Sequence, residues 1–359
     1  MDTNDIISAL LKETEKEFKD NNLVIANDAH FVSNLSFLSS GSYLINYKLT
    51  GNPFKAYPFG RIISLEGPSD SGKTLLASHA IAEVQKIGGI AALFDVERGT
   101  VKSRLENLGI DMNKLLISND KVLEKIFERM IYIIKSVKDK KSDVPLLIIL
   151  DSLSQASTAH EMEVGFDKVD MSRAKIIRAG LRMINSLISD MNVCFIMVNH
   201  QTTKIGGGYR PSHLPPETCV PGGTAVEYFP SMRIETKKGK TYLEGDVPIG
   251  IGVNIRVKKT RFAIPFIKTS VDVYFDRGID PLSGIFDILV GSGVIEKANK
   301  TRYSFVDDKE TTYFRKDIEE MIKSDPEKYL NLLKDNDIIE TATDIVYTDA
   351  ELEEEAENE

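Results

Sequence analysis

The chain of 359 residues has very few cysteines, only Cys194 and Cys219. Cys194 lies in an apolar run and is expected to be buried, whereas Cys219 lies in a polar stretch with no second metal ligand nearby. Two such cysteines exclude a disulfide framework and predict a protein of the reduced cytoplasm. No run of about eighteen apolar residues occurs, which excludes a transmembrane helix. The first residues are acidic, so we expect no signal peptide.

An excess of positive charge is also absent, because the formal net charge at pH 7 is −9. This balance excludes a uniformly basic nucleic-acid-binding protein, but it leaves room for a local basic site. The proportions of hydrophobic residues (42%) and charged residues (28%) are ordinary for a soluble globular protein. The length suits either one large domain with appendages or two domains.

The most informative stretch is GPSDSGKT at residues 67–74, which matches the Walker A pattern G-x-x-x-x-G-K-[ST]. A mostly apolar run at 62–65 predicts a strand before it, and helical spacing at 75–87 predicts a helix after it, a context that a chance match would lack. The glycines let backbone N–H groups surround phosphate oxygens, while Lys73 reaches the β- and γ-phosphates and Thr74 ligates Mg²⁺. The remaining expected nucleotide contacts are Gly67, Pro68, Ser69, Asp70, Ser71 and Gly72.

Apolar strands and amphipathic helices alternate beyond this motif. Their alternation predicts an α/β fold, with a mostly parallel sheet that helices cover on both faces. The carboxyl ends of such strands gather the chemistry, so Thr74, Glu97, Asp151 and His200 are expected at one edge of the sheet. The expected strands are 90–94, 146–150 and 193–198, and the expected helices are 121–137 and 171–191.

Three polar residues follow these strands, and two of them have both a functional and a structural interpretation. Asp151 ends an apolar run, as a Walker B aspartate does, and can hold Mg²⁺ together with Thr74. Glu97 is either a solvated carboxylate or the general base that polarises a water for attack on the γ-phosphate. His200 is either structural or a group that hydrogen-bonds the γ-phosphate and reports its presence to the loop that follows.

Lys258, Lys259 and Arg261 lie at the end of a strand far along the chain. Charges on an edge strand usually serve solvation, but such cations can also reach the phosphates of a neighbouring subunit, as an arginine finger does.

The stretch 201–223 is broken by glycine and proline, and no helix or strand is predicted there. Glycine N–H groups with a few cations can follow a phosphate backbone, and an aromatic ring can stack on bases. Composition alone does not separate this use from a plain flexible loop. The residues concerned are Lys204, Tyr209 and Arg210.

Four segments are expected along the chain. An amphipathic helix at 4–20, which packs either on its own domain or on a neighbouring protomer, and a connector make up residues 1–40. Residues 41–285 are the core, which ends in β-branched, alternating strands, and residues 286–348 form a small α+β domain with charged helices. Residues 349–359 are a disordered acidic tail, which either adds solubility or competes for a basic groove. The late strands are 231–236, 242–247, 252–259 and 270–275, and the late helices are 315–324 and 326–334.

Several short segments, taken in this order, resemble the RecA family of DNA strand-exchange recombinases over residues 40–290. The resemblance implies ATP and Mg²⁺ as cofactors, and single-stranded DNA and homologous duplex DNA as partners. It also implies a homo-oligomer, a helical filament with ATP between protomers, in which Glu97 is catalytic and Lys259 and Arg261 act across the interface. The segments that carry it are 40–42, 58–63, 67–69, 95–97, 108–111, 151–152, 220–225 and 259–261.

DNA contacts follow from the same resemblance. A first DNA loop is expected at about 155–170 and a second at 201–223, and Arg104 stands near an adenine-stacking position. The expected DNA-binding residues are Arg178, Arg182, Lys204, Tyr209, Arg210, Gly222, Gly223 and Thr224.

The variant of the family is similar to the phage UvsX type. His200 stands where bacterial members have glutamine, and Arg261 where they have lysine. This type implies a bacterial host cytoplasm, a mediator protein and a single-strand-binding protein as further partners. The segments that carry the similarity are 170–175, 199–200 and 275–284.

Two other classes of P-loop protein share parts of this pattern. A hexameric replicative helicase has the same core but usually carries a large N-terminal helical domain, whereas about forty residues precede the core here. A small-molecule kinase would lack both the distant cations and the glycine-rich loop.

Overall fold

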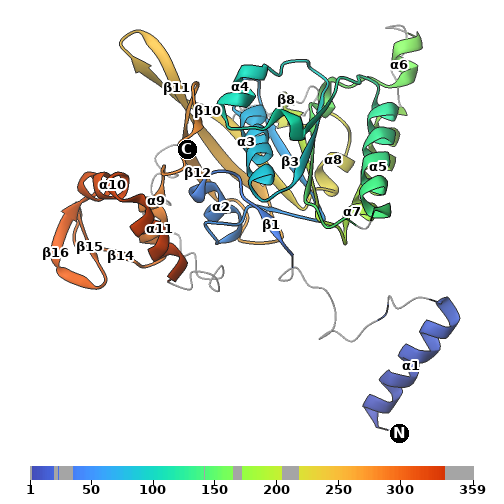
Figure 1. The fold of residues 1–359 in the computed structure, drawn as a ribbon, viewed down its shortest axis with the longest axis horizontal. Coiled ribbons are helices and arrows are strands. Elements are labelled where there is room, and N and C mark those ends of the chain that lie inside the picture. Colours follow the sequence, from blue (N-terminus) through green and yellow to red (C-terminus); the bar gives the residue numbers. More distant parts are fainter. Residues whose placement is uncertain are drawn as a thin grey trace, which may run out of the picture. The chain divides into compact units, whose positions relative to one another are not determined.

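The computed structural model describes residues 2–19, 23, 35–140, 142–164, 172–203 and 218–335. The chain divides into two compact units, residues 1–35 and 36–359 (Figure 1). In the first unit, helix α1 (Thr3–Phe18) begins at Asp2, whose carboxylate forms a capping box with Asp5. This helix confirms the amphipathic helix predicted at 4–20, and none of its residues, all of which the structure describes, is buried.

A sheet of nine strands organises the second unit, in the order β13-β12-β11-β10-β3-β7-β6-β4-β5. The six strands from β10 to β5 run parallel to one another, and β11, β12 and β13 continue the sheet with antiparallel pairings. The predicted parallel core is therefore confirmed. The strands are β3 (Arg61–Gly67), β4 (Ile90–Asp95), β5 (Leu115–Ser118), β6 (Leu146–Asp151), β7 (Val193–His200), β10 (Met232–Glu244), β11 (Val247–Lys259), β12 (Lys268–Tyr274) and β13 (Gly278–Ile279).

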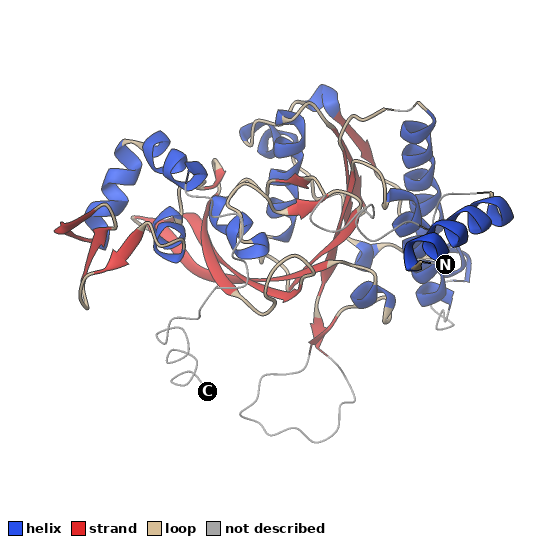
Figure 2. Cartoon of the chain, turned by 90° about the horizontal axis from the view of Figure 1, so that it is seen from below, coloured by secondary structure: helices blue, strands red, loops and turns tan. Residues whose placement is uncertain are grey.

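Helices lie on both sides of this sheet, as Figure 2 shows. Successive residues of a strand point to opposite faces, so Ile62 of β3 joins one hydrophobic core and Ile63 joins the other. The core of Ile62 includes Phe127 and Leu181 from helices on its face, and the core of Ile63 includes Leu76 on the opposite face. The helices concerned are α2 (Tyr43–Thr50), α3 (Lys73–Lys86) and α9 (Ile285–Gly291) on the Ile63 side, and α5 (Leu123–Asp139) and α7 (Ser172–Ile188) on the Ile62 side.

The remaining elements are short or lie near the C-terminus. The small antiparallel sheet β14-β15-β16 confirms the strands expected in the C-terminal α+β domain. Its individual strands could not be located in the sequence, because they are brief and largely polar. The helices predicted at 315–324 and 326–334 are confirmed. The elements are β1 (Phe37–Leu38), β2 (Tyr57–Pro58), α4 (Lys102–Asn107), α6 (Ala159–Val164), β8 (Thr202–Thr203), β9 (Thr218–Cys219), α8 (Ala225–Tyr228), β14 (Ile295–Lys297), β15 (Arg302–Phe305), β16 (Asp308–Phe314), α10 (Arg315–Ser324) and α11 (Pro326–Asp335), with 3₁₀ turns at Met112–Lys114 and Leu153–Gln155.

Two sequence predictions about local structure are wrong. The strand predicted at 242–247 crosses a hairpin turn, because β10 continues to Glu244 and Gly245 turns the chain with a φ of 60° before β11 begins. The stretch 201–223 is not without strands, because β8 and β9 pair antiparallel near its two ends. Short pairings of two residues carry too little hydrophobic pattern to be visible in a sequence.

Several predicted features lie wholly or partly outside the described residues. These are most of the connector before residue 35, the first loop after residue 164, the middle of the second loop with Lys204, Tyr209 and Arg210, residues 336–348 of the small domain, and the acidic tail 349–359. Among the helices that are described, none is long and apolar enough to cross a membrane.

His79 joins α3 to β13. Its Nε2 accepts a hydrogen bond of 2.9 Å from the backbone N–H of Ile279. Burial lowers the pKa of His79 from 6.5 to about 4, so the folded protein keeps this ring neutral. The folding stability that depends on the neutral ring is therefore complete above pH 6.5 and is lost as the pH falls toward 4.

We expect this titration to remove up to about 3 kcal/mol from the free energy of unfolding as the pH falls through that window. His79→Gln keeps an acceptor for the Ile279 N–H but cannot titrate, so its free energy of unfolding should decline less. Denaturant unfolding followed by circular dichroism at several pH values measures both proteins. If the free energy of unfolding declined equally in the wild-type protein and in His79→Gln, His79 would not be protonated in this pH range.

Candidate functional site

The loop at 67–72 joins β3 to α3, as the Walker A pattern predicts. Gly72, with a φ of 89°, caps the helix, and at Gly67 a Cβ atom would collide with the backbone carbonyl of Thr236 on β10. The Ser71 hydroxyl lies 2.8 Å from the Thr236 hydroxyl, which fastens the loop to the same strand. The glycines are thus required both by the turn and by the closeness of β10.

Lys73 is buried and folds back over this loop. Its Nζ donates a hydrogen bond of 2.5 Å to the carbonyl oxygen of Pro68 and lies 3.4 Å from the Ser71 hydroxyl. Burial lowers the pKa of Lys73, while the carboxylates of Asp151 and Glu97 oppose that change. The ammonium therefore stands between the loop and two carboxylates, where a phosphate group can replace the Pro68 carbonyl as its partner.

Thr74 and Asp151 meet as the motifs predict. The Thr74 hydroxyl donates a hydrogen bond of 2.6 Å to Oδ2 of Asp151 at the end of β6. Burial raises the pKa of Asp151 to about 6, and the nearby charges of Glu97 and Asp95 add to this effect. Such a concentration of negative charge favours a bound cation. The described residues hold no group of three metal-ligating side chains, so an ion here would need ligands from phosphate or water.

Glu97 is held by two neighbours. One of its oxygens, Oε1, accepts a hydrogen bond of 2.6 Å from the Ser152 hydroxyl and lies 2.8 Å from Nε2 of His200. Burial disfavours the charge of Glu97, but the hydrogen bonds from Ser152 and His200 outweigh it and lower the pKa of this carboxyl. Both of these contacts use Oε1, and neither of them uses Oε2. The structure thus brings Glu97 and His200 together, and Ser152 is a member of the site that the sequence marked only as the residue after the Walker B aspartate.

A family model for the RecA N-terminal domain matches residues 5–280 of the chain. The chain belongs to the RecA family. It is 35% identical to Protein RecA of Mycoplasma mycoides over 302 residues, which cover 83% of this chain and 82% of that protein. Protein RecA of Thermotoga neapolitana is 32% identical over 299 residues (83% and 81%), and that of Mycoplasma mobile is 28% identical over 330 residues (91% and 94%).

This membership makes the protein a RecA-type recombinase and a DNA-dependent ATPase. The alternative of a hexameric helicase is not favoured, because the matches to RecA proteins extend over most of the chain. The mixed sheet and the small C-terminal sheet agree with a RecA-like core.

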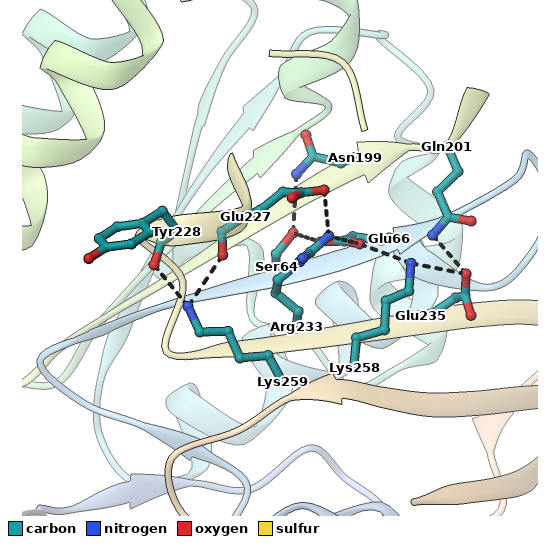
Figure 3. A network of polar contacts seen from close by, with 10 residues as sticks. All are labelled: Ser64, Glu66, Asn199, Gln201, Glu227, Tyr228, Arg233, Glu235, Lys258 and Lys259. Atoms are coloured by element: carbon teal, nitrogen blue, oxygen red, sulfur yellow. Dashed lines mark hydrogen bonds and ion pairs between the residues drawn. The ribbon is translucent and has the colours of Figure 1, made fainter. Parts of the chain in front are cut away.

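Lys259, the last residue of β11, and Arg261, two residues beyond it, lie beside residues outside the P-loop of the same chain. Lys259 donates hydrogen bonds to the backbone carbonyls of Tyr228 (2.8 Å) and Glu227 (3.3 Å) at the end of α8 (Figure 3). Arg261 lines a pocket of about 240 Å³ together with Arg61, the first residue of β3. β3 carries the P-loop at its other end, so about 20 Å of strand separates Gly67 from Arg61, the β3 residue that shares this pocket with Arg261.

Part of the predicted DNA-binding set lies together on α7 and α8. Arg178 and Arg182 are exposed one turn apart on α7. Gly222 and Gly223 approach the same helix, since a Cβ atom on Gly222 would lie 3.2 Å from Ile177 and one on Gly223 would lie 3.3 Å from Ala174. Thr224 follows as the cap of α8. Predicted DNA contacts that lie about 40 residues apart in the sequence are thus carried by α7 and the segment packed against it.

Arg104 and the first predicted DNA loop lie elsewhere in the fold. Arg104 is exposed on the short helix α4, which follows the loop after Glu97. In the first predicted DNA loop, residues 155–164 are described, and Glu161 accepts a hydrogen bond of 2.8 Å from the N–H of Thr158 and lies 3.6 Å from Arg173. This acidic residue is therefore engaged within the chain itself.

The contact between Ser152 and Glu97 gives a direct test of the site's electrostatics. In Ser152→Ala the carboxylate loses its shortest hydrogen bond, so the pKa of Glu97 should rise. Carbon-13 NMR titration of side-chain-labelled glutamates measures it, and Glu97→Gln identifies the signal. An unchanged titration in Ser152→Ala would contradict the arrangement.

Proposed function

We propose that this protein assembles as a helical filament on single-stranded DNA, pairs that strand with homologous duplex DNA and exchanges the strands. ATP binds between protomers, and its hydrolysis weakens DNA binding and allows turnover. The observation that carries this proposal is the separation of two sets of charged groups along β3. The P-loop lies at one end of the strand and Arg261 lies beside the other.

One protomer supplies the binding half of each ATP site. The loop 67–72, Lys73 and Thr74 would surround the phosphates, and Thr74 and Asp151 would hold Mg²⁺, which would neutralise negative charge on those phosphates. Glu97 accepts a proton from the attacking water through the oxygen that Ser152 and His200 leave open. His200, which contacts the same glutamate and ends β7 directly before the second loop, detects the γ-phosphate and reports its presence to that loop.

The neighbouring protomer supplies the cations. Lys259 and Arg261 stabilise the charge that develops on the transferred phosphate, as an arginine finger does. Their position in the chain supports this role, because neither lies at the P-loop end of the sheet. Arg104, exposed on α4, contacts the base of the nucleotide.

DNA binds along α7 and the second loop. Arg178 and Arg182 contact phosphates, and Gly222, Gly223 and Thr224 present backbone N–H groups to the same strand. These contacts are few, which suits a protein of net negative charge with a local DNA surface. The remaining proposed contacts, Lys204, Tyr209 and Arg210, lie outside the described residues.

Exposed apolar surfaces support a homopolymer. In the N-terminal unit Leu10 and Phe18 are more than half exposed. In the second unit, Leu116 of the edge strand β5 and Tyr132 of helix α5 line an open pocket of about 590 Å³. Such patches usually mark protein interfaces. We assign both to contacts with other copies of this chain.

The phage UvsX type is the finer assignment that we propose within the RecA family. It rests on the residues that are similar to that type, among them His200 and Arg261. Under this assignment the protein works in the cytoplasm of a bacterial host, with a mediator protein and a single-strand-binding protein.

Glu97→Gln tests the proposed base. The substitution keeps the size and the hydrogen bonds of the side chain but removes its ability to take a proton, so ATP hydrolysis should fall by about 10²–10⁴-fold. Binding of ATP and of single-stranded DNA should survive. Phosphate release and fluorescence anisotropy measure the two properties, with Glu310→Gln, an exposed glutamate of β16, as control. Near-normal turnover of Glu97→Gln would exclude this base.

A mixing experiment tests the shared site. Lys73→Ala lacks a working P-loop and Arg261→Ala lacks the finger, so each protein alone should hydrolyse ATP poorly. An equimolar mixture should recover up to about one quarter of the wild-type rate, because one of the four ordered interfaces joins an intact P-loop to an intact finger. The DNA-stimulated ATPase is measured over a range of mixing ratios. If no ratio restores activity, the cations do not act in trans.

A further inference from the structure

A network of charged side chains lies beside the two ends of the second loop (Figure 3). At its centre Glu66, the last side chain of β3 before Gly67, is fully buried and accepts hydrogen bonds of 2.7 and 3.0 Å from Arg233 of β10. Lys258 of β11 places its Nζ 3.9 Å from Glu66 and 3.4 Å from Glu235. Gln201, directly after β7, donates a hydrogen bond of 2.8 Å to Glu235.

Lys258 is the extra residue of a β-bulge. Arg233 pairs with Lys259 and Ile234 pairs with Val257, so two steps along β11 match one step along β10. A bulge redirects the residues beside it. Here it places Lys259 on the face of Arg233, together with Lys258, although neighbouring residues of a regular strand point to opposite faces. The bulge therefore determines the direction in which the chain leaves β11 toward Arg261.

The charges around Lys258 hold this bulge in place. A buried carboxylate such as Glu66 is costly unless cations compensate it, and Arg233 and Lys258 are the cations that the network supplies. Burial also disfavours the charge of Glu235, but the hydrogen bond from Gln201 and the ammonium of Lys258 outweigh it and lower the pKa of Glu235. Lys258 thus joins two carboxylates, and it cannot move without leaving one of them less well compensated.

Both ends of the second loop connect to the same network. Gln201 is the first residue after β7, and it reaches Lys258 through Glu235. At the other end α8 follows Gly223, and its Glu227 lies 3.2 Å from Arg233 while its last carbonyls accept hydrogen bonds from Lys259. A displacement of either end of the loop is therefore transmitted to β11 by direct polar contacts.

We propose that Lys258 is a positioning residue, held by Glu66 and Glu235, which directs Lys259 and Arg261 toward the ATP of the neighbouring protomer and links their position to the ends of the DNA-binding loop. This inference rests on the proposed function, because it needs the two cations to act in trans. Lys258 itself does not touch the nucleotide. Its effect belongs to the protomer that donates the cations, and not to the protomer that holds the ATP.

The mixture of Lys73→Ala and Arg261→Ala separates these two protomers. Lys258→Met keeps much of the apolar stem but removes the charge. In the Lys73→Ala protein, which donates the cations, the additional substitution Lys258→Met should lower the recovered DNA-stimulated ATPase by roughly 5- to 30-fold through kcat. In the Arg261→Ala protein, which donates the P-loop, the same addition should change the recovered rate by less than about 2-fold. Lys258→Arg in place of Lys258→Met in the Lys73→Ala protein should restore most of the lost rate.

Two controls accompany this experiment. Lys309→Met removes an exposed lysine of β16, paired with Glu296, and should leave the recovery unchanged in either protomer. Thermal unfolding of each protein shows whether it is folded. If Lys258→Met does not fold, Glu235→Gln takes its place, since it weakens the hold on Lys258 while it preserves the shape of the side chain, and the same asymmetry is expected.

The outcomes distinguish failure of the positioning role of Lys258 from failure of the shared ATP site. Equal losses in the two protomers, or a loss confined to the P-loop donor, would overturn the positioning role of Lys258 and leave the shared site intact. A parent mixture that never recovers activity would overturn the shared site, and with it this inference. A loss confined to the cation donor, rescued by Lys258→Arg, supports both.

Discussion

The direction of the strands beside β3 is the constraint on which the rest of the structure depends. β3 and β10 run parallel, so the carboxyl end of β3 delivers the P-loop to the edge where β6 and β7 also end, with Asp151 and His200. β11 returns antiparallel to β10, and its end lies toward the start of β3. The same three strands thus place the phosphate-binding loop at one edge and the cations Lys259 and Arg261 toward the other. In the function proposed above, copies placed end to end would bring these two sets of groups together.

The surroundings of Asp151 and Glu97 shift the pKa values of these two carboxyl groups in opposite directions. Burial and neighbouring negative charge raise the pKa of Asp151, whereas hydrogen bonds from Ser152 and His200 lower that of Glu97. A carboxylate whose charge is disfavoured gains most from a bound cation, and an ionised carboxylate with one oxygen open can accept a proton. Environment, more than residue type, therefore separates the proposed metal ligand from the proposed base.

The network around Glu66 occupies a place where hydrophobic residues would stabilise the sheet more simply. Buried ion pairs are weak sources of stability, because the desolvation of the charges offsets their attraction. Their geometry is strict, however, and here it holds a bulge and two ends of a loop in one arrangement. Strict geometry of this kind suits the proposed link between the second loop and the position of Lys259 and Arg261.

Local patterns in the sequence determined most of the core. The Walker A motif, the apolar run before Asp151 and the helical spacing after residue 171 are each complete within a short window, so strand, helix and site residue could be read together. The assignment to the RecA family likewise needed only the order of short segments. The C-terminal helices were predicted correctly for the same reason, since their periodicity is local.

Tertiary structure alone decided the contacts between distant segments. The sequence shows that Ser152 follows Asp151, but only the packing of β6 against β4 brings its hydroxyl to Glu97. Glu66 is one charge in an apolar run, and its partners Arg233 and Lys258 lie more than 160 residues away. The bulge at Lys258 is a mismatch between two strands, and no single strand encodes it. Strand pairing and register bring such residues together, and these depend on the whole sheet and not on any local stretch.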